Sequence, residues 1–79
     1  MSEIDRSPAG LVEFIAKAIV GDADAVQVGE ADGGSTLELE TADDDRGRVI
    51  GRQGRVAKAM RAVLGASRHG ANLRLEIID

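Results

Sequence analysis

The stretch Arg48-Val49-Ile50-Gly51-Arg52-Gln53-Gly54-Arg55 places two glycines around two polar residues, after an apolar pair and before an amphipathic helical pattern. A glycine pair at this spacing is common by chance, so the charge around it decides what it indicates. Six basic residues and no acidic one lie between positions 46 and 61: Arg46, Arg48, Arg52, Arg55, Lys58 and Arg61. Glycine permits a tight turn and a close approach of the backbone to a ligand. Together, these two features predict a loop that holds a polyanion.

The composition limits the classes of protein that this chain can form. Its 79 residues suffice for one small domain, which buries only about 60% of its unfolded surface and has little room for a deep cavity. The core must be aliphatic, because Phe14 is the only aromatic residue, and the absence of cysteine excludes disulfides and thiolate chemistry. No apolar run approaches the roughly 20 residues of a membrane span, and the acidic N-terminus is unlike a signal peptide. We therefore expect a cytoplasmic location.

The net charge of −4 hides a strong asymmetry between the two halves of the chain. Residues 1–45 carry two basic and twelve acidic side chains, a balance of −10, whereas residues 46–79 carry eight basic and two acidic ones, a balance of +6. In the simplest interpretation, the acidic half keeps the protein soluble and the basic helix is an ordinary solvated helix. Because the positive charge coincides with the glycine loop, we favour one face suited to a polyanion.

The N-terminal residues predict a covering helix. Ser7 is a suitable cap, Pro8 is preorganised for the first helical position, and Gly21 is placed to end the helix. Glu13 and Lys17 lie four apart, which suits an ion pair on the outer face. The apolar stripe, with Phe14 at its edge, recurs at helical spacing: Leu11, Val12, Ile15, Ala18 and Ile19.

Two strands are expected next. Residues 25–28 form the first, residues 31–34 supply turn chemistry, and residues 35–41 return as the second strand of an antiparallel hairpin. The second strand alternates, so Leu37 and Leu39 should face the core while the glutamates between and after them face water.

Three aspartates, Asp43-Asp44-Asp45, precede the basic stretch. Adjacent carboxylates diverge and lack calcium-loop spacing, so we interpret them as a helix cap rather than a metal site. Residues 46–50 then predict a short helix that packs through Val49 and Ile50.

The last third of the chain predicts a longer helix, a loop and a strand. The helix starts after Gly54 and ends at Gly65, with an inward stripe of Val56, Met60, Val63 and Leu64 and a basic stripe of Arg55, Lys58 and Arg61. Residues 68–70 are expected to be a loop, in which the lone His69 has no partner for a metal or catalytic set. Residues 72–78 predict a strand with Leu73, Leu75 and Ile77 inward, and with Arg74 facing Glu38 or Glu40 across the sheet.

The expected order is helix, strand, strand, short helix, glycine loop, helix, strand. Helices on one face of a three-stranded sheet make an α+β layer fold. This order and the Val49-Ile50-Gly51-Arg52-Gln53-Gly54 core resemble the KH domain, in its bacterial (type II) arrangement, where an extra helix and strand precede the core. Length and loop are similar to the small stand-alone bacterial KH family. On that resemblance, residues 7–79 form a single KH domain and residues 1–6 a tail.

The resemblance implies a non-catalytic protein that binds single-stranded RNA, a post-transcriptional regulator or RNA chaperone. KH domains use the G-x-x-G loop to clamp a four-nucleotide backbone segment. Val49, Ile50, Val56 and Ala57 are candidates for the floor of the adjoining groove, although some of them can equally be core. The RNA-binding candidates are Gly51, Arg52, Gln53, Gly54, Arg55, Lys58, Arg48, Val49, Ile50, Val56 and Ala57.

Other functions stay open at this point. The family pairs as homodimers or with a second, larger KH protein, so the chain can be mainly a dimerisation module. Single-stranded DNA is an alternative ligand, because loop contacts to phosphate do not read the 2′-hydroxyl. An enzyme is a poor interpretation, because no nucleophile–base pair, metal set or Walker loop can be assembled. We expect no cofactor and no small-molecule substrate.

Overall fold

The computed structural model describes residues 7–67 and 70–78. The predicted tail of residues 1–6, and Arg68 and His69 of the predicted loop, lie outside the described residues. The helices are α1 (Pro8–Ile19), α2 (Arg46–Ile50) and α3 (Arg55–Ala66), and the strands are β1 (Gln27–Ala31), β2 (Thr36–Glu40) and β3 (Arg74–Ile77). Single 3₁₀ turns occupy Ala23–Ala25, Asp32–Gly34, Asp43–Asp45 and Arg52–Gly54. None of the helices in the described ranges is long and apolar enough to cross a membrane.

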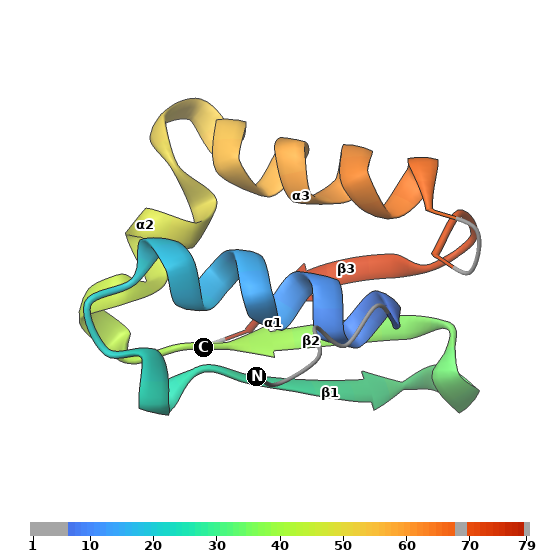
Figure 1. Ribbon diagram of the computed structural model, residues 1–79, viewed down its shortest axis with the longest axis horizontal. Coiled ribbons are helices and arrows are strands. Elements are labelled where there is room, and N and C mark those ends of the chain that lie inside the picture. The colour runs from blue at the N-terminus through green and yellow to red at the C-terminus, as the bar shows by residue number, and fades with distance from the viewer. Residues whose placement is uncertain (1–6, 68–69, 79) are drawn as a thin grey trace, which may run out of the picture.

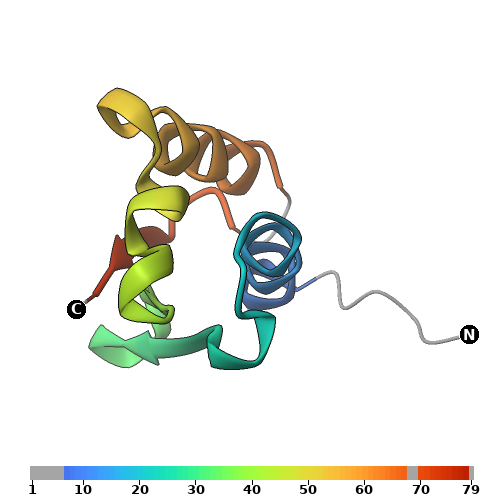
Figure 2. The ribbon, with the colours of Figure 1, turned by 90° about the vertical axis from the view of Figure 1, so that its left-hand side faces the viewer.

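The strands form one mixed sheet in the order β1-β2-β3. β1 runs antiparallel to β2, with Val28 opposite Leu39, and β2 runs parallel to β3, with Leu37 opposite Leu75. Helices α1 and α3 cover one face of the sheet, and α2 lies at the end where β2 stops (Figures 1 and 2). The α+β fold and the order of its elements are confirmed.

The core is aliphatic, as the composition requires. Leu37 and Leu39 of β2 lie at its centre, at 1% and 0% exposure, in line with their predicted inward orientation. Every helix and strand adds to this cluster: Val12, Ala16, Val26, Leu37, Leu39, Val49, Met60, Leu64 and Leu75 are buried in it, with Val28 packed against it from β1. Burying aliphatic side chains is the main stabilising contribution in a domain of this kind, at about 25 cal/mol per Å².

In both long helices, the residues that are buried differ from the predicted apolar stripes. In α1, Ala16 is fully buried, whereas Ala18 and Ile19 are exposed, because the core contacts follow Val12 and Ala16 rather than the helix end. In α3, Val63 is 43% exposed and the helix continues through Gly65 to Ala66. The predicted cap of α1 is confirmed, since Ser7 Oγ accepts a hydrogen bond from Gly10 N at 3.1 Å.

β1 lies later in the sequence than the predicted residues 25–28. Residues 23–25 form a 3₁₀ turn, and the strand runs from Gln27 to Ala31 because pairing with β2 places Ala31 opposite Thr36. The chain therefore turns over Asp32–Gly34. Arg74 was also misplaced: it stands beside Thr36 in the register and pairs at 3.8 Å with Glu76 of its own strand.

The role predicted for the three aspartates is corrected as well. No side chain caps α2 through a hydrogen bond. Instead, the buried carboxylate of Asp45 accepts hydrogen bonds from the backbone amides of Gly21 and Asp22, both at 3.0 Å. These amides lower the pKa of Asp45, aided by Arg48 and opposed by burial. Asp45 thus ties the segment after α1 to the start of α2 and fixes the short helix that leads into the glycine loop.

Candidate nucleic-acid interface

The loop between α2 and α3 is a compact turn built from positive backbone angles. Gly51 has φ +78° and ψ 169°, Gln53 has φ +57°, and Gly54 has φ +73°. The turn is held by three backbone hydrogen bonds, from Gly51 N to Gly47 O at 2.8 Å, from Gly54 N to Gly51 O at 3.1 Å and from Arg55 N to Arg52 O. Arg52 and Gln53 stand exposed at its tip.

The two glycines have different roles. A methyl group at Gly51 would lie 2.5 Å from Val56 Cγ2 and 2.8 Å from Val56 N, so this glycine lets the loop pack against the first turn of α3. A methyl group at Gly54 would meet nothing within 4 Å. Gly54 therefore leaves open space at the start of α3, where a ligand can approach the backbone.

In the first turn of α3, the amide of Arg55 donates to Arg52 O, and no side chain caps the amides that follow it. The cap residue of α3, Gly54, provides no side chain to accept from the amides of that turn, in contrast to Ser7 at the start of α1. Uncapped amides at a helix N-terminus, together with the helix dipole, favour an anion. The opening of α3 is thus suited to a phosphate group.

The cations around the loop fall into two groups. Arg46 pairs with Asp43 at 2.9 Å, and Arg48 pairs with Asp45 at 3.5 Å, so both are engaged with the aspartate turn. Within residues 7–67 and 70–78, by contrast, Arg52, Arg55 and Lys58 form no ion pair with an acidic side chain. All three are exposed, and Arg55 Nη2 donates only to Gln53 Oε1, at 3.4 Å. The unneutralised positive charge therefore lies at the loop and on the first turn of α3.

The candidate groove residues separate by burial. Val49 is 0% exposed and Ala57 is 4% exposed, so both would support a groove floor from beneath. Ile50, at 38% exposure, and the half-buried Val56 keep surface that a ligand can touch.

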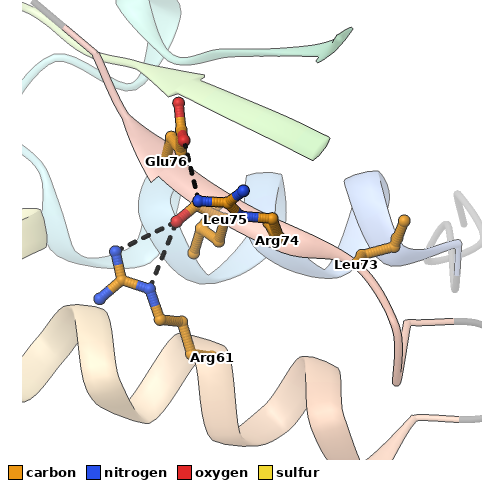
Figure 3. A pocket seen from close by; sticks show the side chains of 5 residues that line it. All are labelled: Arg61, Leu73, Arg74, Leu75 and Glu76. Atoms are coloured by element: carbon orange, nitrogen blue, oxygen red, sulfur yellow. Dashed lines mark hydrogen bonds and ion pairs between the residues drawn. The ribbon is translucent and has the colours of Figure 1, made fainter. Parts of the chain in front are cut away.

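A second feature lies further along α3, facing the edge of the sheet. A hollow of about 440 Å³ is lined by Arg61 of α3 and by the strand residues Leu73, Arg74, Leu75 and Glu76 (Figure 3). Arg61 donates two hydrogen bonds to the carbonyl oxygen of Leu75, from Nε at 3.3 Å and from Nη2 at 3.1 Å. Arg61 was not among the predicted site residues, because the contact joins positions 14 residues apart. The one available signal was its spacing of three from Lys58, which places both on the same side of the helix.

The arrangement can hold an extended anionic strand. It offers backbone amides, an apolar edge and the exposed cations Arg52, Arg55 and Lys58, and the described residues contain no cluster of acidic, histidine or cysteine side chains that could hold a metal ion. The element order, with a G-x-x-G loop joining α2 to α3, defines a KH domain of the type II arrangement.

Comparison with known proteins gives the family. The model of the KhpA/KhpB KH domain matches residues 9–77, and the chain belongs to that family. A protein named RNA-binding protein KhpA from Halalkalibacterium halodurans is 48% identical over 73 residues, which cover 87% of this chain and 96% of the relative. Proteins of the same name from Clostridium acetobutylicum and Streptomyces coelicolor are 46% and 41% identical, with 85% and 86% of this chain and 92% and 87% of the relative covered. No solved structure matches the chain.

Proposed function

We propose that this protein is a non-catalytic binder of single-stranded RNA that grips the sugar–phosphate backbone with the Gly51–Gly54 loop. One observation carries the proposal: Arg52, Arg55 and Lys58, which have no acidic partner among the described residues, surround a glycine turn that opens an uncapped helix. The names of the relatives, which describe RNA-binding proteins, support RNA as the polyanion.

In this mode the loop clamps about four nucleotides, as in other KH domains. The amides at the start of α3 and the side chains of Arg52, Gln53, Arg55 and Lys58 contact phosphates, while Arg48 adds positive potential from α2. Bases then lie over Ile50 and Val56, with Val49 and Ala57 supporting them from the core. Titration of the isotope-labelled protein with single-stranded RNA, mapped by amide resonances, tests this proposal, since it predicts the largest shifts around the loop.

Tight binding requires more than one copy. Base stacking on aromatic rings contributes about 1–3 kcal/mol per base, and the only aromatic side chain, Phe14, lies on α1 rather than at the loop. Joining two sites raises the overall affinity without a new contact. The function that we propose is therefore post-transcriptional regulation, or RNA chaperoning, in the cytoplasm by an assembly of KH proteins.

We also infer that the chain pairs with a second copy or with a second KH protein. Three large apolar side chains are exposed on the helices that cover the sheet: Phe14 at 55% and Ile19 at 38% on α1, and Val63 at 43% on α3. Exposed apolar groups of this size are typical of contact surfaces. The mass in solution, measured by light scattering, should be that of a dimer, and Val63→Asp should reduce it to that of a monomer. A monomer at all concentrations in the unmodified chain would contradict self-pairing.

A further inference from the structure

The outer edge of β3 is an open edge of the sheet. Arg74 N and Ile78 N donate to carbonyl oxygens of the β2 side, those of Ser35 and Leu39, at 3.0 and 2.9 Å. Backbone groups alternate in direction along a strand, so the amide and carbonyl of Leu75 face away from β2. Such an edge normally offers one donor and one acceptor to a ligand that lies along it.

Arg61 changes which hydrogen-bonding groups this edge presents to a ligand. Its Nε and Nη2 both donate to Leu75 O, so the acceptor at this position is occupied (Figure 3). A guanidinium has five N–H donors in a planar fork, and this contact uses two of them. The end of the fork, formed by Nη1 and the second hydrogen of Nη2, stays available for a bidentate contact. Because the carbonyl fixes the fork, little entropy is lost when a ligand binds to it.

The Glu76 carboxylate, which also lines the hollow, already has a cation beside it. Glu76 lies 3.8 Å from Arg74 and extends from β3 away from Arg61 (Figure 3). Next to Arg61, the hollow therefore presents the donors of the guanidinium and of the Leu75 amide, and the half-buried Leu73 adds apolar surface further along the strand.

The bases differ in how they match such a surface. Guanine has two adjacent acceptors, O6 and N7, which arginine binds in bidentate fashion, whereas adenine places an amino donor beside N7. An adenine amino group at Leu75 would meet a carbonyl oxygen that already accepts two hydrogen bonds from Arg61, and it would lose that hydrogen bond on burial. The hollow also lies within reach of the loop, since Arg61 follows Gly54 by seven residues, or about 10 Å along a helix.

We propose that Arg61, held by the Leu75 carbonyl, makes this hollow a guanine-selective base site. The inference rests on the proposed RNA-binding function and names the base that the edge of β3 prefers. Without the Arg61 side chain, Leu75 O becomes free to accept the adenine amino group, so the preference should shift from guanine to adenine.

The test compares two oligouridylates of equal length, one with a single central guanine and one with a single central adenine, by fluorescence anisotropy. The unmodified chain should bind the guanine strand about fivefold or more tightly. Arg61→Met keeps the aliphatic stem but removes every donor, and it should abolish or reverse that ratio. Arg55→Met removes the same charge from α3. It should lower the affinity for both oligonucleotides equally, which leaves the ratio of the two affinities unchanged.

The outcomes separate this inference from the function on which it rests. An unchanged ratio in Arg61→Met, or equal binding of both strands by the unmodified chain, would overturn the guanine site while leaving RNA binding intact. If Arg61→Met fails to fold, Arg61→Lys keeps the charge without the fork, and a retained preference in that variant would overturn the inference. Failure of the unmodified chain to bind either strand would overturn the proposed function and this site with it.

Discussion

Replacement of Arg52 and Gln53 together by aspartate should abolish RNA binding at concentrations that saturate the unmodified chain, and should leave the thermal melt nearly unchanged. Both side chains are exposed at the tip of the loop, so folding does not depend on their packing. Gln53 has φ +57°, a conformation in which aspartate is better tolerated than most residues. The change alters the local charge by three units, each worth about 1 kcal/mol near a phosphate in water, and we expect a loss of about 100-fold in affinity.

A matched control separates a local effect from a change in net charge. Lys17→Asp with Gln27→Asp makes the same charge change at exposed positions on α1 and β1. Fluorescence anisotropy with a labelled oligouridylate should show near-normal binding for this control. If both double variants bind equally well, or lose affinity equally, the loop is not the site of contact.

The second large effect concerns the two loop glycines, which should respond very differently to alanine. Gly51 occupies a region of φ and ψ that is essentially restricted to glycine, and its methyl group would strike the backbone nitrogen of Val56. Backbone strain and overpacking together should cost about 3 kcal/mol or more, which lowers Tm by more than about 12 °C in a domain of this size. Gly54 also has a left-handed backbone conformation, but a methyl group there would meet no other atom within 4 Å. Gly54→Ala should therefore lower the free energy of unfolding by only about 1 kcal/mol.

Circular-dichroism melts of the two single variants measure this difference directly. Gly54→Ala should also weaken RNA binding although it remains folded, because the added methyl group lies where a phosphate approaches. Equal Tm values for the two variants would show that Gly51 is not required for packing against α3.

The sequence predicted the elements that depend on local signals. The Ser7 cap, the alternation around Leu37 and Leu39, and the helix break at Gly51 each act over a few residues, and each was located correctly. The cationic loop was recognisable for the same reason, because glycines and basic residues adjoin in the chain.

Features set by distant contacts could not be predicted in this way. The bounds of β1 follow from its register with β2, and Asp45 binds amides that lie more than twenty residues earlier. In the sequence, Arg61 has the pattern of an ordinary exposed helix residue. Its contact with the Leu75 carbonyl exists only because the fold places the edge of β3 beside α3. Long-range pairing also decides which helix faces are buried, which is why Ala16 and Val63 were misassigned.

Amide resonances of the isotope-labelled protein, followed while single-stranded oligouridylate is added at low ionic strength, test the central claim most directly. We predict that the largest shifts fall between Arg48 and Lys58, that amides of the outer sheet face such as Glu38 remain still, and that added salt reverses the shifts because phosphate contacts release counterions. Absence of any shift between Arg48 and Lys58 at saturating RNA would contradict a glycine loop that grips the RNA backbone.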